Sequence, residues 1–103
     1  MSVIFAGDFF YNYGKKPIIA HESLRDAIMR CSEFIVNLEG PIVNEEPVVI
    51  QKVGPIKHQC KSSSSLLKSL GTTAVILANN HIMDGDRKGL ENTIEMLNKS
   101  NIE

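Results

Sequence analysis

Along the chain, segments with the apolar pattern of strands alternate with segments in which apolar residues recur at helical spacing. Three short segments are typical of buried strands: residues 3–6 and 74–77 are apolar throughout, and residues 34–39 are apolar at first and polar at the end. Between and after them, apolar residues recur at helical spacing, at residues 22–31, between the serine run 62–65 and Gly71, and at residues 86–99. This alternation of strand and helix predicts an α/β fold in which right-handed crossovers build a mainly parallel sheet.

The expected helices also carry boundary and burial signals. Gly71 is expected to cap the C-terminus of the second helix because glycine tolerates positive φ. Asp86 is expected to be the N-cap of the third helix, and His21 a surface or capping residue at the start of the first. The residues expected to face inward are Leu24, Ala27, Ile28, Leu66, Leu67, Leu70, Leu90, Ile94 and Leu97.

Residues 42–59 interrupt the regular alternation. Proline, glycine and several β-branched residues make this segment either an irregular excursion or a small hairpin with strand-like composition at residues 47–53. Lys52, Lys57 and His58 are candidates for binding an anionic substrate, although a solvated loop is the simpler interpretation of each. At the other end of the chain, Ile102 and Glu103 are expected to begin a fourth strand.

Length, charge and cysteine content narrow the class of protein. A chain of 103 residues is expected to form one domain at most. A formal net charge of −1 indicates no basic surface for nucleic acid or an anionic membrane. No apolar run approaches the roughly 20 residues of a membrane helix. Because signal-peptide features are missing and Cys31 and Cys60 stand far apart, a cytoplasmic location is expected.

Polar side chains gather where each expected strand ends. Asp8 follows the first strand, and Asn37 and Glu39 end the second. The third strand is followed by a denser group: Asn79, Asn80, His81 and Asp84. The carboxyl ends of parallel strands share one edge of a sheet, where open α/β folds bind their ligands. Turn and cap preferences explain one or two of these residues, but not the whole group.

The chemistry of these side chains suits metal-dependent hydrolysis of a phosphoester. Carboxylate and amide oxygens and an imidazole are ligands for Mn, Mg, Fe or Zn rather than for soft metals. Two such ions held close together can clamp a phosphate and activate a hydroxide, and Glu39 or Asp8 could bridge them. A carboxylate near a strand end is costly to bury unless it is paired or metal-bound. An imidazole such as His81 can protonate the leaving oxygen.

Several sequence blocks resemble the capsule-synthesis (poly-γ-glutamate, CapA-type) family, which is similar to the calcineurin-like metallophosphoesterases. The blocks are Gly7-Asp8, Asn37-Leu38-Glu39-Gly40-Pro41 and Leu77-Ala78-Asn79-Asn80-His81-Ile82-Met83-Asp84, followed by Gly89-Leu90 and Thr93. They cover nearly the whole chain in the order and spacing of the family. The resemblance implies the N-terminal portion, β-α-β-α-β-α, of a layered sandwich built on a mainly parallel sheet.

The resemblance also implies roles for individual residues. Three of them, Asp8, Glu39 and Asn80, fall on metal-ligand positions. His81 falls on the histidine that follows the ligand asparagine and assists catalysis. The remaining polar residues of the blocks would support these ligands or face the substrate: Asn37, Asn79 and Asp84.

The chain departs from the family in two respects. The family usually has glycine two residues after the aspartate that corresponds to Asp84, whereas here the order is Gly85-Asp86. Metallophosphoesterases also take histidine ligands from later strands, and His21 and His58 do not match those positions. Residues 1–103 are therefore expected to form a single partial domain with half a metal site, inactive alone and prone to dimerise through an unpaired sheet edge.

Two functions remain in consideration. The first is a metal-dependent phosphoesterase-type hydrolase of the capsule-synthesis family, acting on an anionic small molecule or polymer. The second is a non-catalytic module of the same fold that binds a polymer or a partner protein through Lys52, Lys57 and the aromatic residues near Phe9. A nucleotide-binding domain is a weaker alternative because no glycine-rich phosphate loop follows the first strand.

Overall fold

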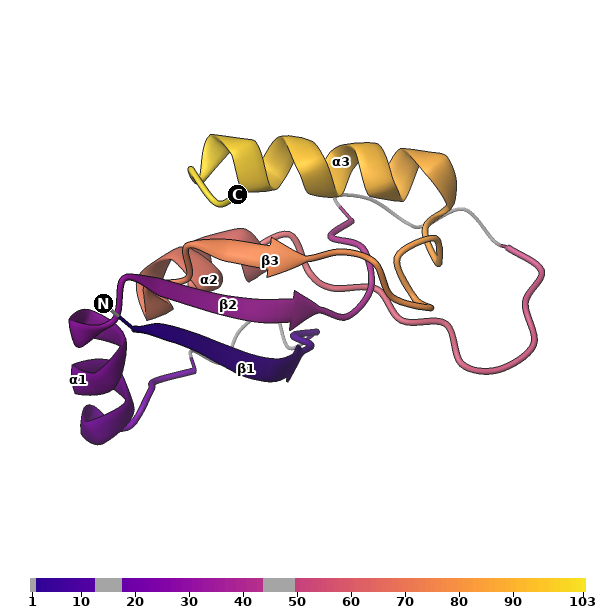
Figure 1. Ribbon diagram of the computed structural model, residues 1–103. Coiled ribbons are helices and arrows are strands. Elements are labelled where there is room, and N and C mark those ends of the chain that lie inside the picture. The colour runs from indigo at the N-terminus through magenta and orange to yellow at the C-terminus, as the bar shows by residue number, and fades with distance from the viewer. Residues whose placement is uncertain (1, 13–17, 44–49) are drawn as a thin grey trace.

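The computed structural model describes residues 2–12, 18–43 and 50–103, and within them strands and helices alternate as predicted (Figure 1). The strands are β1 (Val3–Phe9), β2 (Glu33–Leu38) and β3 (Ala74–Ile76). The helices are α1 (Glu22–Arg30), α2 (Ser63–Leu70) and α3 (Asp86–Lys99). None of these helices has the length and apolarity needed to cross a bilayer.

The three strands form one parallel sheet in the order β1-β2-β3, which confirms the α/β prediction. β1 runs past its expected end to Phe9, and after a shift in register Asp8 lies opposite Asn37 of β2. Glu103 lies beside β3: its N–H donates to the Thr73 carbonyl at 3.0 Å, and its carbonyl accepts the Val75 N–H at 2.9 Å. These bonds are those of a parallel neighbour, as expected for the start of a fourth strand.

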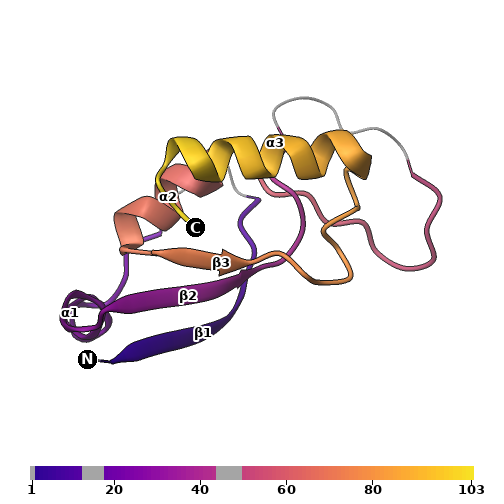
Figure 2. The ribbon, with the colours of Figure 1, turned by 45° about the horizontal axis from the view of Figure 1, so that its top comes forward.

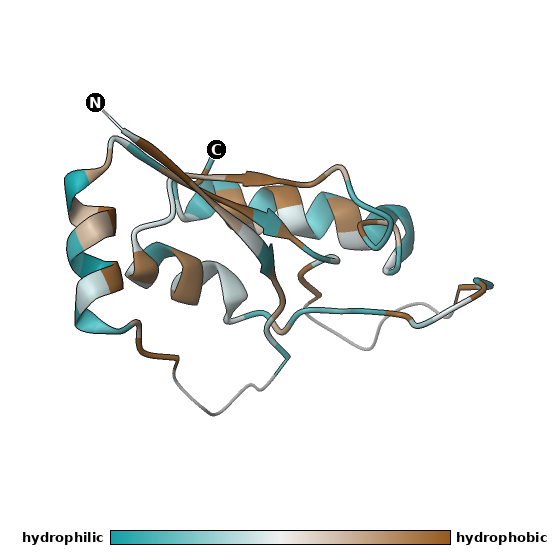
Figure 3. Cartoon of the chain, turned by 60° about the horizontal axis from the view of Figure 1, so that its bottom comes forward, coloured by the Kyte–Doolittle hydropathy of each residue, from teal (hydrophilic) through white to brown (hydrophobic). Residues whose placement is uncertain are grey.

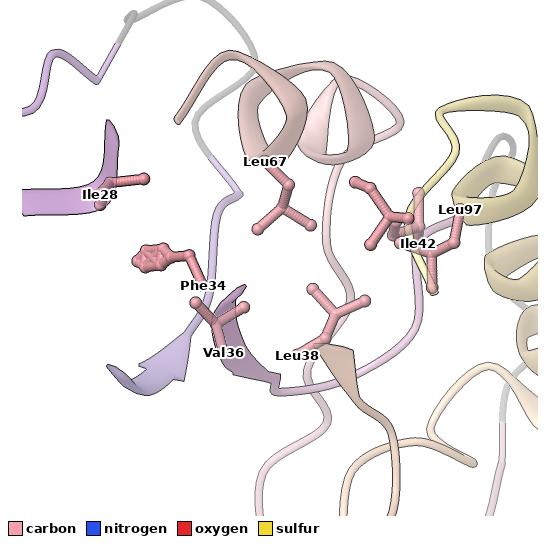
Figure 4. Packing of buried hydrophobic residues seen from close by; sticks show 8 residues of the cluster. Ile28, Phe34, Val36, Leu38, Ile42, Leu67 and Leu97 are labelled. Atoms are coloured by element: carbon pink, nitrogen blue, oxygen red, sulfur yellow. The ribbon is translucent and has the colours of Figure 1, made fainter. Parts of the chain in front are cut away.

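Sequential strand order determines where the helices lie. When parallel strands follow one another in chain order, right-handed crossovers place their connecting helices on the same face. α2 and α3 lie on the same side of the sheet (Figure 2). All three helices contribute to one buried cluster against β2 (Figure 4), made of Ile28, Phe34, Val36, Leu38, Ile42, Leu67, Leu97 and Ile102.

The opposite face of the sheet carries exposed hydrophobic side chains. Phe5 of β1 is 70% exposed, and Val3 and Ile76 are each nearly half exposed. Hydropathy colouring shows the hydrophobic character of the strands (Figure 3). No helix among the described residues packs over Phe5, and the sheet therefore has one covered face and one bare face.

Two residues expected to face inward are exposed. Leu24 of α1 is 46% exposed and Ile94 of α3 is 45% exposed, so both predictions were wrong. Leu97 of α3 is buried as predicted, together with Gly89 and Thr93, which were not predicted to face inward. The helix presents this stripe because the Thr93 hydroxyl accepts the backbone N–H of Ile42 at 2.8 Å. A buried N–H needs such a partner, and this requirement outweighs the burial of one more aliphatic side chain.

Two of the three cap predictions are confirmed. His21 is the N-cap of α1, and its Nδ1 accepts the Ser23 N–H at 3.2 Å. Gly71 ends α2 in the left-handed region at φ 89°. Asp86 is not the N-cap of α3, because Gly85 holds that position and Asp86 is the first helical residue, at φ 58°. An N-cap side chain reaches the N–H groups ahead of it from extended backbone, which Asp86 does not have.

The segment before α2 forms no strand in its described part, residues 50–60. The prediction of an irregular excursion holds there, while residues 44–49, which carry part of the hairpin alternative, lie outside the described residues. Gln59 is fully buried and anchors the segment. Its Nε2 donates to the carbonyls of Phe9 at 3.0 Å and Glu39 at 3.1 Å. The segment therefore crosses the ends of β1 and β2, where the candidate site lies.

Candidate functional site

The carboxyl ends of the three strands are joined by side-chain hydrogen bonds. The Asn37 amide donates to Asp8 Oδ1 at 2.7 Å, and the Asn79 amide donates to Asn37 Oδ1 at 3.3 Å. Asn79 Oδ1 in turn accepts the backbone N–H of His81 at 3.0 Å. The parallel register makes Asp8 and Asn37 neighbours, and Asn79 extends the chain of contacts from β3. One network therefore links all three polar strand ends.

His81 and Asp84 form a buried pair in the turn between β3 and α3. His81 Nδ1 lies 2.7 Å from Asp84 Oδ2, and the two residues are 6% and 1% exposed. Because a carboxylate can only accept, we assign the ring proton to Nδ1, which donates it to Asp84. His81 Nε2 is then the ring atom directed at Glu39, 3.8 Å from Oε1. The pair orients an imidazole toward the end of β2.

Asp84 has the largest number of partners in this cluster. Lys52 Nζ donates to its Oδ1 at 2.6 Å, and the backbone N–H of Lys57 donates to its Oδ2 at 2.7 Å. Burial raises the pKa of the Asp84 carboxyl, but the hydrogen bonds from Lys52, Lys57 and His81 together outweigh burial and hold that pKa below its ordinary value. Asp84 is therefore a fixed anion at neutral pH.

Glu39 is paired with a second lysine of the same segment. Lys57 Nζ donates to Glu39 Oε1 at 2.9 Å and lies 5.4 Å from the centre of the Phe10 ring. The Glu39 side chain is 17% exposed and that of Lys57 is 32% exposed. This pair therefore lies nearer to solvent than the Asp84 carboxylate, whose side chain is 2% exposed.

Lys52 also approaches two other groups of the turn. Its Nζ donates to the Asn80 carbonyl at 3.3 Å and lies 3.0 Å from His81 Nδ1. An ammonium only donates, and Nδ1 already carries a proton, so the Lys52–His81 approach is not a second hydrogen bond to that nitrogen. Lys52 serves mainly to neutralise Asp84 and to hold the turn through Asn80.

Gln59, which joins the ends of β1 and β2, is a residue of the network that the sequence reasoning did not single out. Its only signal in the sequence is its position two residues after Lys57. His58, a candidate for binding an anion, has its Nε2 2.8 Å from the Asp84 carbonyl. Lys52 and Lys57, for which a solvated loop was the simpler interpretation, are engaged with Asp84 and Glu39. Asn80 is exposed, and its assigned role stays a prediction.

The donor chemistry of these residues fits a hard divalent cation. Asp8 and Glu39 offer carboxylate oxygens and Asn80 an amide oxygen, which suit Mg or Mn. The ammonium of Lys57 already brings positive charge to Glu39 Oε1. The described residues do not form a closed cage, since among them no three His, Cys, Asp or Glu side chains lie close enough together to hold a metal ion.

Comparison with known families agrees with the sequence blocks. Residues 2–103 match the family model described as bacterial capsule synthesis protein PGA_cap. This match spans all six elements and all three polar strand ends, and it confirms the resemblance drawn from the blocks. No curated protein matches the sequence. The chain therefore belongs to the bacterial capsule synthesis protein family.

Proposed function

We propose that the protein is a metal-dependent, phosphoesterase-type hydrolase of the capsule and poly-γ-glutamate synthesis family, acting on an anionic small molecule or polymer. The observation that carries this proposal is the buried His81–Asp84 pair, with Nδ1 and Oδ2 2.7 Å apart. A carboxylate that fixes the tautomer and orientation of an imidazole is a recurring arrangement in general acid–base catalysis. Its position at the shared strand ends supports a role in chemistry.

In this proposal His81 transfers the proton. Asp84 holds Nδ1–H, so Nε2 is the atom that donates to the leaving oxygen and later takes a proton back. Imidazole suits both steps because it changes charge near neutral pH. The ionised Asp84 stabilises the imidazolium while Nε2 carries its proton. Glu39 Oε1, 3.8 Å from Nε2, marks the direction in which the reacting group would lie.

Asp8, Glu39 and Asn80 would hold the divalent cation, with a second ion in the complete site, as Mn, Mg, Fe or Zn. Such a cation would supply Lewis-acid stabilisation of the charge on the phosphoryl oxygens. The asparagines support this arrangement: Asn37 fixes Asp8 through a 2.7 Å hydrogen bond, and Asn79 fixes the turn that carries Asn80. The Asp8 carboxylate is thereby oriented before any ion binds.

The test is hydrolysis of a chromogenic phosphodiester with Mn²⁺ by the purified protein. We expect His81→Ala to lower kcat by about 100-fold or more, the scale of a lost general acid. His21→Ala is the matched control, because His21 only caps α1 and should leave kcat unchanged. The proposal fails if Glu39→Ala and His81→Ala leave both metal content and hydrolysis intact.

The open ligand set favours a second candidate, a non-catalytic module that binds a polymer or a partner protein. Among the described residues no cluster of His, Cys, Asp and Glu is ready to hold a metal. In this case binding of a polyanion would persist in the presence of a chelator and survive His81→Ala. Binding that is lost with either treatment would exclude it.

The edge of β1 supports self-association. β1 lies at the end of the strand order, and no strand pairs with its outer edge among the described residues. Phe5 and Val3 on this strand are exposed. An unpaired edge offers backbone donors and acceptors to another strand. A dimer formed through this edge is part of the proposal.

A further inference from the structure

Two lysines from one segment pair with two of the acidic side chains of the site, and the two pairs differ in how deeply they are buried. Lys52 contacts Asp84 at 2.6 Å, where the acidic side chain is only 2% exposed. Lys57 contacts Glu39 at 2.9 Å, with side chains 32% and 17% exposed. Removing the partner of a fully buried charge is strongly unfavourable, whereas separating a pair that solvent partly reaches costs less. The Lys57 ammonium can therefore leave its partner far more readily than Lys52 can.

The backbone of Lys57 is fixed independently of its ammonium. Its N–H donates to Asp84 Oδ2 at 2.7 Å, and the next residue, His58, contacts the Asp84 carbonyl at 2.8 Å. Its carbonyl passes so close to Gly40, at φ 93°, that a Cβ there would lie 2.7 Å from the oxygen. Side-chain rotation can thus withdraw the ammonium from Glu39 while the segment stays in place.

We propose that the Lys57 ammonium occupies the cation position at Glu39 Oε1 in the metal-free chain, and that a divalent cation binds there only by displacing it. The two cations repel each other and compete for the same carboxylate oxygen. Lys57 therefore sets the metal affinity of the site. This inference rests on the proposed function, since it requires Glu39 to be a metal ligand.

The direct test is titration of the purified protein with Mn²⁺ by calorimetry, comparing wild type with Lys57→Met. Loss of the competing charge should lower the Mn²⁺ Kd by at least about tenfold. Lys61→Met is the matched control, because Lys61 is an exposed lysine four residues further along the chain and the substitution removes the same charge. Its Kd should equal that of wild type, and Lys57→Arg should not bind Mn²⁺ more tightly than wild type does.

The outcomes separate this inference from the proposed function. Equal Mn²⁺ affinity in wild type and Lys57→Met would overturn the competition while leaving Glu39 as a ligand. No Mn²⁺ binding in any variant would overturn the proposed function and the inference together.

Nitrogen-edited NMR of the wild-type lysine ammonium groups during Mg²⁺ titration needs no variant. The Lys57 signal should shift with saturation while that of Lys52 stays; an unmoved Lys57 signal would contradict the competition.

Discussion

Asp84 connects the stability of the protein to the orientation of its imidazole. It is 1% exposed and bonded to Lys52, to the Lys57 N–H and to His81. Its pKa in the folded chain lies below the ordinary value of 3.8. The ionised Asp84 carboxylate therefore contributes its full stabilisation of the fold above the pKa that Asp84 has in the unfolded chain. This contribution is lost as pH falls through the lower pKa that Asp84 has in the folded chain. Neutral pH retains it, and strongly acidic pH removes it.

Asp84→Asn should destabilise the folded chain by about 3 kcal/mol at pH 7, because it leaves Lys52 beside a neutral buried partner. Urea unfolding at pH 7 and at pH 3 measures this effect, and the difference between variant and wild type should shrink at the lower pH. Asp26→Asn, on the exposed face of α1, should change stability little at either pH. If Asp84→Asn lowers the free energy of unfolding by the same amount at both pH values, Asp84 is not ionised in the folded chain as assigned.

Asp86 adopts backbone that favours glycine. Its φ is 58°, two residues after Asp84, where the family resemblance implies glycine. Asp86→Gly should therefore stabilise the fold by about 1 kcal/mol, since a side chain in left-handed backbone is strained. Lys88→Gly, inside the same helix, should instead destabilise by about 1 kcal/mol. Thermal unfolding of the two variants checks the opposite signs, and a loss of stability in Asp86→Gly would contradict the assigned strain.

At the level of elements, periodicity identified each helix and strand because hydrophobic spacing and local caps act over a few residues. The bounds of α3 agree with the prediction. Local pattern did not predict which stripe of α3 is buried, since that depends on Ile42, 51 positions away. The same holds for Lys52 and Lys57, whose partners Asp84 and Glu39 are distant in sequence. Sequence pattern therefore did not predict the polar contacts between residues that are distant in the chain.

The contact between α3 and the end of β2 depends on one hydroxyl. Thr93 is fully buried and accepts the Ile42 N–H at 2.8 Å. Thr93→Val keeps the shape but leaves that N–H unpaired, and should cost about 1–3 kcal/mol. Thr93→Ser keeps the acceptor and should cost only about 1 kcal/mol for the lost methyl group. If urea unfolding gives Thr93→Ser a lower free energy of unfolding than Thr93→Val, this role of the hydroxyl is contradicted.

At the scale of the whole molecule, one face of the sheet and the outer edge of β1 are bare among the residues that the structure describes. Phe5 is 70% exposed and Val3 is 49% exposed on β1. Phe5→Lys should shift the chain toward monomer in sedimentation experiments, because charge on an edge strand opposes edge pairing. Met29→Lys on α1 is the control, since Met29 is 82% exposed but lies outside the sheet. A monomer at every concentration, or equal effects of both substitutions, would contradict dimerisation through β1.

The convergence of three strand ends is the central feature of the molecule, and the metal it is proposed to bind can be measured directly. Electron paramagnetic resonance of Mn²⁺ added to the purified chain counts bound and free ion. We predict saturable binding that is lost in Glu39→Ala and retained in Glu91→Ala, whose side chain is exposed on α3. Absence of binding, or equal binding by Glu39→Ala and wild type, would contradict the assignment of a metal site to these strand ends.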